Sequence, residues 1–403
     1  MRKWMNRILA MLFLLFIAVM FLVTMVKEGE LYAYGFFKSY KSKLTEDATL
    51  FDDLRARISK LEYNTRERLF LKDEMRLLNA RFQKLIGKDV YDVGGKDTIR
   101  LTNGAFYDMF TQESTDEKML ELIDFSKKLK ADKNIDTAFV YCHCGVYEEN
   151  LLPEKYRVMD GNNAFADRVT ETMAASGISV TDSRDAYVRA NLAPDQAIMY
   201  SDIHWTHRMA LETAYDAVIN MNKDLGLNLD ETALLYDRFT DEVHEKLLLG
   251  EIGVRLGENI VPKDDVHVLY PNYETDLIYK SEKDGVITER AGAFEETVVE
   301  RDKLSLDGEN DYSITAYYVY GDYLATLQVV NENAPDKRVL VFKDSYGTPV
   351  SAFLTLAARE VVSVDLRSTT LSIEEVVNQV NPDVVVFAYS QQMLRKFDYE
   401  IAE

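Results

Sequence analysis

The chain has 403 residues, of which 47% are hydrophobic and 29% are charged, and its formal net charge is −21 at pH 7. This length and apolar content suit one large α/β domain with an insertion, or two domains. The negative charge repels phosphate backbones and anionic lipids, which excludes nucleic acid as a partner and requires a hydrophobic segment for any attachment to a membrane.

An uncharged apolar run occupies 8–26, close to the start of the chain. As a helix it would span about 28 Å, which is close to the thickness of a hydrocarbon core. The basic side chains within 1–7 place that end in the cytoplasm and everything after Lys27 outside it. A cleaved signal peptide is the alternative, but its apolar core would be shorter and would end in a small-x-small site. The sequence therefore predicts a single-pass transmembrane anchor at 8–26.

Residues 27–88 are predicted to form a helical stalk. Apolar side chains recur at spacings of three and four residues in 50–61, with charged residues between them. A second run at 69–86 is followed by Gly87, a residue type that commonly ends helices. Because the apolar pattern is short and broken, the stalk is expected to pack on the body of the protein and not to form a free coiled coil.

From residue 89 onward, helical and strand patterns alternate, which predicts a mostly parallel sheet with helices on both faces. The predicted helices are 115–130, 164–176, 206–224, 349–359 and 372–380. The predicted strands are 136–141, 178–181, 197–200, 338–342, 361–365 and 383–388. Residues 225–335 are predicted to be an insertion with antiparallel β structure, which has β-prone runs at 266–270, 314–319 and 325–330.

Ser345 lies in the segment 343–347, between a predicted buried strand and the helix that starts near Pro349. Ligand sites in parallel sheets form beyond the carboxyl ends of the strands. At that edge the Ser345 N–H would lie near a helix N-terminus, where a developing oxyanion is stabilised. Serine is also a common turn and cap residue, so this segment alone leaves a purely structural role open.

Asp202 and His204 lie in a second segment of the same kind, between a short predicted strand and a long helix. Their spacing places both side chains on the same side of an extended backbone. A serine hydroxyl needs an adjacent base, and the base needs a carboxylate that fixes its tautomer. The two segments together favour a catalytic set with Ser345 over a capped helix start, in which Thr206 is the cap and His204 a core residue.

Cys142 and Cys144, the only cysteines of the chain, flank His143 at the end of a predicted strand. They cannot form a disulfide framework, so the fold must be stabilised by its core. Their spacing does not match a zinc site, and no metal or other cofactor is predicted. The two thiols are interpreted as neighbours that form a strained or transient disulfide. His207, one turn into its helix, is predicted to lie at the surface.

The order of these motifs resembles the DHHW family of bacterial proteins, which is similar to the SGNH-like domains of the alginate O-acetylation proteins AlgX and AlgJ. The resemblance rests on Asp-Ile-His-Trp-Thr at 202–206, a β-rich stretch, and Lys-Asp-Ser-Tyr at 343–346, and it covers most of the chain after the apolar run. Looser matches occur at 64–87, 140–144, 320–322, Asn331 and 364–367. The resemblance implies an SGNH hydrolase-like α/β domain over 89–403.

The resemblance also implies roles for individual residues. Ser345 would be the acyl-accepting nucleophile, His204 its general base and Asp202 the carboxylate that orients the base. The Ser345 N–H and the region of Gly321 would line an oxyanion site.

Two further residues, Tyr346 and Arg367, would lie near the substrate. Two positions depart from the family pattern, because Ile203 stands where a second histidine is frequent and Asp322 where glycine or asparagine is frequent. A carboxylate beside an oxyanion would repel it, so Asp322 puts the predicted oxyanion site in doubt.

The function implied by the resemblance is O-acetyl transfer to a cell-surface polysaccharide, or hydrolysis of its acetyl esters, outside the cytoplasm. A transferase would work beside a multispanning membrane protein that brings acetyl groups across the bilayer. The alternative is a catalytically silent binding or scaffold protein of the cell envelope, which Asp322 favours and the intact Ser345–His204–Asp202 set opposes. A third hypothesis is a structural envelope protein whose only role is the stalk.

Overall fold

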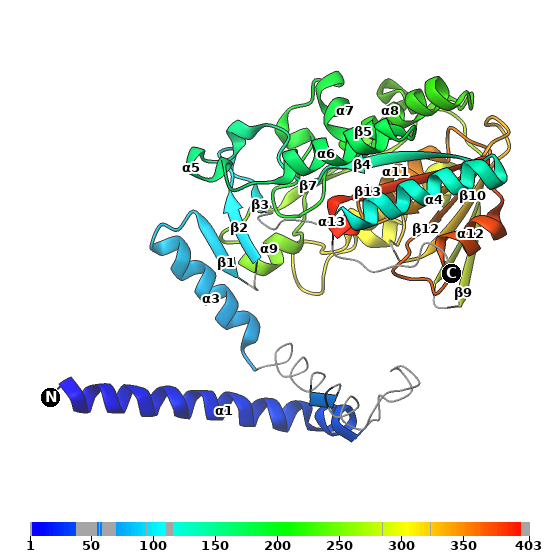
Figure 1. Cartoon of the computed structure of the whole chain (residues 1–403). Coiled ribbons are helices and arrows are strands. Elements are labelled where there is room, and N and C mark those ends of the chain that lie inside the picture. Colours follow the sequence, from blue (N-terminus) through cyan, green and yellow to red (C-terminus); the bar gives the residue numbers. More distant parts are fainter. Residues whose placement is uncertain are drawn as a thin grey trace. The chain divides into compact units, whose positions relative to one another are not determined.

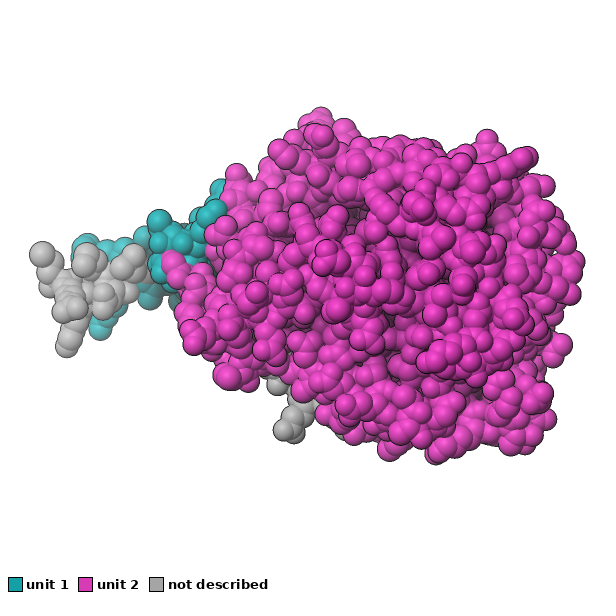
Figure 2. All heavy atoms as spheres, turned by 90° about the horizontal axis from the view of Figure 1, so that it is seen from above, with its two compact units in different colours: residues 1–86 teal, residues 87–403 magenta. Residues whose placement is uncertain are grey.

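The computed structural model describes residues 2–37, 55, 57–58, 70–93, 96–109, 116–283, 285–322 and 324–395 (Figure 1). The chain divides into two compact units, Met1–Ile86 and Gly87–Glu403, which Figure 2 shows in different colours. The residues that were predicted to carry chemistry all belong to the second unit, so the description below concentrates on it.

The first unit contains two long helices, α1 (Arg2–Phe37) and α3 (Lys72–Leu85). α1 runs through the predicted anchor at 8–26, and α3 covers most of the periodic run at 69–86. Among the helices of the described residues, none is both long enough and apolar enough to cross a membrane. The transmembrane segment at 8–26 stays a prediction from the sequence. Most of the periodic run at 50–61 lies outside the described residues.

An eight-stranded sheet forms the centre of the second unit, in the order β5-β4-β13-β11-β12-β10-β8-β9. The strands are β4 (Asp136–Cys142), β5 (Ser179–Asp182), β8 (Leu277–Lys283), β9 (Val286–Gly292), β10 (Thr326–Asn331), β11 (Arg338–Lys343), β12 (Glu360–Val364) and β13 (Val384–Ser390). The strands from β5 to β12 in this order are parallel, and the last three continue the sheet in antiparallel fashion. The predicted mostly parallel sheet is confirmed, and part of the 225–335 insertion extends it.

Helices cover both faces of this sheet, as predicted (Figure 1). One face carries α7 (Ser183–Arg189), α8 (His207–Leu225) and α11 (Gly347–Leu354). The other carries α4 (Glu117–Lys133), α6 (Asn162–Ala175), α12 (Ile373–Val380) and α13 (Gln391–Arg395). In β13, Val386 and Ala388 face the first layer, whereas Val385 and Phe387 face the second. Strands buried on both faces have this continuous apolar sequence.

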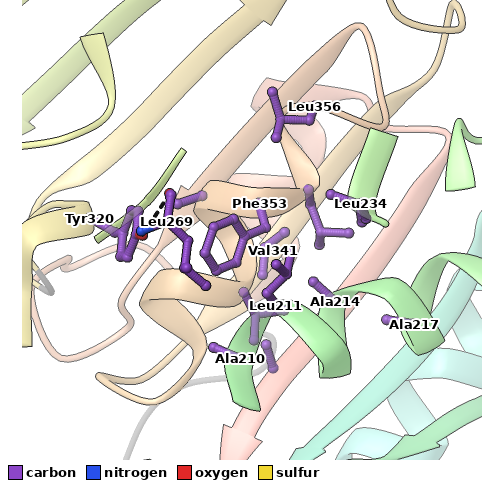
Figure 3. Close-up of a cluster of buried hydrophobic side chains, with 14 of the residues drawn as sticks. Ala210, Leu211, Ala214, Ala217, Leu234, Leu269, Tyr320, Val341, Phe353 and Leu356 are labelled. Carbon is purple, nitrogen blue, oxygen red and sulfur yellow. Dashed lines mark hydrogen bonds between the residues drawn. The ribbon is translucent and has the colours of Figure 1, made fainter. Parts of the chain in front are cut away.

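The packing of α8 on α11 is the contact that matters most for the site (Figure 3). Ala210 and Ala214 on α8 lie in one hydrophobic cluster with Phe353 of α11 and Val341 of β11. Small side chains let the two helices approach closely. Asp202 and His204 directly precede α8, and Ser345 directly precedes α11, so this contact brings together two loops that are far apart in the sequence.

Smaller elements surround the main sheet. A three-stranded sheet consists of β1 (Val90–Val93), β2 (Lys96–Arg100) and β3 (Phe106–Asp108), and a two-stranded ribbon of β6 (Phe239–Leu248) and β7 (Asp264–Pro271). Short helices are α5 (Glu154–Arg157), α9 (Glu251–Leu256), α10 (Phe294–Thr297) and the 3-10 helix η7 (Ala316–Tyr320).

Two predicted strands are wrong. The run 197–200 folds back on the residues after it, since Ile198 forms an isolated bridge with Trp205 and the Thr206 N–H donates to the Ala197 carbonyl at 2.9 Å. The run 314–319 instead enters η7. Its Tyr317 is buried against other rings, so tertiary packing overrides the local preference for extended structure.

Candidate active site

Ser345 lies in the turn that joins β11 to α11. Its Oγ is 2.8 Å from Nε2 of His204. The buried carboxylate of Asp344 fastens the turn, because its Oδ1 accepts the N–H groups of Tyr346 at 3.0 Å and Gly347 at 3.3 Å. Its Oδ2 accepts the N–H of Ser390 at 2.9 Å and also the Ser390 hydroxyl. Asp344 therefore ties the Ser345 turn to the end of β13.

Gly347 makes the turn sharp enough to present Ser345 at the edge of the sheet. A Cβ at this position would lie 2.5 Å from the carbonyl oxygen of Ala388 and 2.9 Å from Cβ of Lys343. Only glycine lets α11 begin this close to the two strands beneath it.

His204 and Asp202 form the other half of the site. The Nδ1 atom of His204 contacts Oδ1 of Asp202, and the His204 backbone N–H donates to the same oxygen at 3.0 Å. The Glu251 N–H donates to Oδ2 of Asp202 at 2.8 Å. Burial opposes the ionisation of Asp202, but the contacts with His204 and Glu251 outweigh it and hold the pKa of this carboxyl below its usual range. An ionised Asp202 keeps the Nδ1 proton of His204 in place and leaves Nε2 facing Ser345.

The loop that carries Asp202 is held by residues from two other elements. Oγ of Ser201 accepts the N–H of Gly250 at 2.8 Å, and the Ser201 carbonyl accepts the N–H of Gly253 at 2.8 Å. The carboxylate of Asp264, on β7, accepts the Ser201 N–H at 2.7 Å and its hydroxyl at 2.6 Å. Burial raises the pKa of Asp264 to about 7. No local sequence pattern marks these residues, because their contacts span 49 to 63 positions of the chain.

The close approach of α9 to Asp202 gives a prediction for Gly250. A Cβ there would lie 2.6 Å from Cγ of Asp202 and closer still to Oδ2. Gly250→Ala is therefore expected to displace the carboxylate and to lower kcat/KM for an acetyl ester by about 10²-fold. A loss of this size is typical when a catalytic group is misplaced by about 1 Å. Val254→Ala, a more exposed position on the same helix, is the control and should retain activity. Wild-type activity in Gly250→Ala would show that the position of Asp202 does not matter.

Of the other predicted site residues, Tyr346 and Arg367 line a cleft with Ser345, and Gly321 does not. The cleft has a volume of about 170 Å³. The Gly321 N–H donates to the carbonyl of Tyr318 at 3.1 Å, so it is not available to an oxyanion. Within the described residues, the Ser345 N–H has no acceptor, which leaves it available to an oxyanion. Tyr346 is buried, and its hydroxyl donates to the carbonyl of Ile203.

Asp322 is bound by groups that do not line the Ser345 cleft. Its carboxylate pairs with Nζ of Lys283 and accepts the Leu324 N–H at 2.9 Å. Burial opposes its ionisation, but Lys283 and the Leu324 N–H prevail and lower the pKa of Asp322. Asp322 is not among the described residues that line the cleft, and its charge is paired with that of Lys283.

A second cavity, of about 230 Å³, adjoins the Ser345 cleft. The two share four lining residues, Ile203, His204, Tyr346 and Gln392. Aromatic rings form part of its wall, from Phe106, Tyr107 and Trp205, and charged groups lie at Lys96, Asp97 and Asp108. An aromatic wall with polar groups beside it suits a sugar ring.

Cys142 and Cys144 are free thiols in the structure, so the predicted disulfide is not formed. Cys142 lies in the hydrophobic core, whereas Cys144 lines the second cavity together with His143. The described residues contain no group of three or more side chains suited to hold a metal ion. His143 is buried, and its Nδ1 has no hydrogen-bond partner in the part of the chain that the structure describes. Burial lowers the pKa of His143 to about 4, against the opposing charge of Asp182.

His143 therefore makes the protein sensitive to acid. The unfolded chain takes up a proton at His143 below about pH 6.5, whereas the folded chain does so only near pH 4. The free energy of unfolding therefore decreases as the pH falls from about 6.5 to 4. Between pH 7.5 and 4, the free energy of unfolding of the wild type should fall by about 3 kcal/mol more than that of His143→Leu. Urea unfolding at several pH values measures this difference. The same change in the free energy of unfolding with pH in the two proteins would contradict this prediction.

His207 is buried, with 1% of its surface exposed, and its prediction as a surface residue is wrong. Its Nδ1 contacts the carbonyl of His267 at 2.8 Å and its Nε2 the carbonyl of Tyr317 at 2.9 Å. The first turn of α8 lies under β7 and η7, two parts of the insertion whose packing no local pattern reveals.

Comparison with known proteins gives structural matches only. No protein-family model and no curated protein matches the sequence. A DHHW family protein from Eubacterium siraeum shares 15% identity and a TM-score of 0.58, over 77% of this chain and 95% of that one. PatB1 from Bacillus cereus, solved with a sulfonyl adduct, shares 14% identity and a TM-score of 0.57, over 77% and 99%.

The O-acetyltransferase domain of Pseudomonas putida AlgJ shares 11% identity and a TM-score of 0.42, over 75% of this chain and 93% of that domain. The similarity to DHHW proteins that the motifs suggested is found in the fold of the first two of these proteins. The chain has the fold of the DHHW family protein from Eubacterium siraeum and of PatB1.

Proposed function

We propose that the protein is an O-acyltransferase or esterase in which Ser345 is the nucleophile, His204 the general base and Asp202 the carboxylate that orients it. The observation that carries this proposal is the 2.8 Å contact between Nε2 of His204 and Oγ of Ser345, with Asp202 bound to the opposite ring nitrogen. This distance is within reach for proton transfer. A linked serine, imidazole and carboxylate in a cleft is the arrangement that acyl transfer requires.

The geometry supports a two-step reaction. In the first step, Oγ of Ser345 attacks the acyl carbonyl while Nε2 of His204 takes the hydroxyl proton. The resulting oxyanion is stabilised by the Ser345 N–H beside the start of α11. His204 then returns the proton to the departing oxygen, which leaves an acyl ester on Ser345. In the second step, His204 takes a proton from a sugar hydroxyl or from water, and that oxygen attacks the acyl carbonyl. The bond to Oγ of Ser345 then breaks, and His204 returns the proton to Oγ.

One observation supports a serine nucleophile, and a second supports a short acyl group and a sugar as the reactants. PatB1, which has the same fold, was solved with a sulfonyl adduct, and serine nucleophiles form adducts of this kind. The cleft around Ser345 is small, which suits a short acyl group, and the adjoining cavity has the aromatic wall that suits a sugar. Work outside the cytoplasm, attachment to a membrane and a multispanning partner are predictions that rest on the sequence alone.

An assay with a small acetyl ester as donor tests the proposal. The full-length protein is incubated with the ester, with and without oligosaccharides, and the products are analysed by mass spectrometry. A transferase produces oligosaccharide that carries acetyl groups, and an esterase releases acetate in both mixtures. Absence of both products, from protein that is shown to be folded, would contradict the proposal.

A further inference from the structure

The imidazole of His204 lies against a buried tyrosine that no sequence motif pointed to. The ring of Tyr317 stacks on that of His204, with 4.0 Å between the ring centroids and 17° between the planes. Tyr317 has 2% of its surface exposed. Tyr346, at 4.8 Å, and Tyr318, at 5.9 Å, also approach the imidazole, but their rings are tilted by 46° and 79°. Of these three tyrosines, Tyr317 is the one that presents the face of its ring to His204.

Tyr317 also contacts the nucleophile turn. Its hydroxyl donates to the backbone carbonyl of Ser345 at 3.4 Å. One side chain therefore touches both the residue that takes the proton and the residue that loses it. Because Ser345 and His204 lie on separate loops, a group that contacts both limits their relative movement.

Other residues fix the position of Tyr317. His207 stacks near its ring, with centroids 5.3 Å apart, and Nε2 of His207 contacts the Tyr317 carbonyl at 2.9 Å. At the end of η7, the hydroxyl of Tyr320 donates to the carbonyl of Leu269 at 2.7 Å and accepts the Leu269 N–H at 2.6 Å. These contacts hold η7 on β7, so Tyr317 has little freedom to turn away from His204.

We propose that Tyr317 is a positioning residue for the reaction proposed above, on which this inference rests. Its ring keeps Nε2 of His204 in line with Ser345 and stabilises the imidazolium that forms when His204 takes the proton. The electron-rich face of an aromatic ring attracts a cation within about 6 Å of its centre, and the attraction is stronger where water is excluded. The neutral imidazole gains less from this face, so the contact favours the protonated intermediate over the resting enzyme.

Tyr317→Leu removes the ring and keeps an apolar side chain. The kcat for the acetyl ester is expected to fall by about 10- to 100-fold with KM nearly unchanged, since the lost contact acts on the protonated state. The ascending limb of the pH–rate profile should move to lower pH, because the imidazolium loses stabilisation. Tyr317→Phe retains the ring and should recover most of the lost kcat together with the original profile. Tyr279→Leu removes an equally buried tyrosine from the same hydrophobic cluster and serves as the control for packing.

Phenylalanine analogues with increasing fluorination, incorporated at position 317, provide a second test if Tyr317→Leu does not fold. Fluorine weakens the negative face of the ring with little change in size, so kcat should fall stepwise along the series. Constant kcat and an unmoved pH profile along the series, or in a folded Tyr317→Leu, would overturn this inference. Such a result would leave the proposed function intact, whereas a wild-type protein without activity that depends on Ser345 would overturn the proposed function itself.

Discussion

Ser345→Ala is expected to lower kcat for acetyl-ester turnover by about 10⁴-fold or more, because alanine has no oxygen to form the acyl ester. The loss should appear in kcat, since the cleft that binds the ester is otherwise retained. Steady-state assays of the purified variant beside the wild type measure the effect. The variant should unfold at nearly the same temperature as the wild type, because a partly exposed hydroxyl is removed and no large cavity is made.

Ser351→Ala is the matched control for this experiment. Ser351 lies in α11, soon after the nucleophile turn, and its hydroxyl donates only to the Thr348 carbonyl within the same helix, at 2.8 Å. The activity of the Ser351→Ala variant should stay close to that of the wild type. A Ser345→Ala protein that retains substantial turnover would exclude a covalent role for this serine and would leave a binding or scaffold function as the better explanation.

Asp202→Asn is expected to lower kcat by about 10⁴-fold near neutral pH, with the fold retained. The amide of asparagine has one acceptor oxygen, and it cannot serve both His204 and the Glu251 N–H as the carboxylate does. The variant also lacks the negative charge that stabilises the imidazolium. His204 would then adopt the wrong tautomer or turn away, and Ser345 would lose its base. The measurement is the pH dependence of kcat for both proteins.

A second aspartate–histidine pair in the same protein provides the control for Asp202→Asn. Oδ1 of Asp241 lies 2.8 Å from Nδ1 of His267 at a partly exposed position on β6 and β7. Asp241→Asn removes the same charge from the same kind of pair, away from the cleft. It should leave kcat unchanged. Equal losses in the two variants would indicate a general electrostatic or folding effect and not a role in orienting the base.

The parallel part of the sheet could be predicted from sequence because its physical cause is local. Runs such as Val-Leu-Val-Phe in β11 and Val-Val-Val-Phe in β13 are apolar at every position, and only strands covered on both faces need that composition. The alanine face of α8 likewise marks the side that packs closely on the sheet and on α11. Of the elements that were missed, 197–200 folds back on the residues after it, whereas η7 has a conformation set by contacts with distant segments.

The same division holds for the candidate site. Ser345 could be found because it follows a strand pattern and precedes a helix, which places it at the edge of the sheet. Asp202 and His204 could be found from their spacing and their place before a long helix, although the strand predicted before them does not form. Tyr317 could not be found, because its partners lie in the loops before α8 and α11, far away in the sequence. Asp322 shows the opposite error, since it follows Gly321 in the chain but pairs with Lys283 in space. Proximity in sequence was mistaken there for proximity to the reacting groups.

The central claim is that His204 activates Ser345, and covalent labelling tests it most directly. The folded protein is treated with a sulfonyl fluoride, and the modified peptide is identified by mass spectrometry at several times. A single adduct on Ser345 is predicted for the wild type, with labelling at least about 100-fold slower in a folded His204→Ala variant. An unlabelled Ser345 in the folded wild type, or equal labelling rates in the two proteins, would contradict the account.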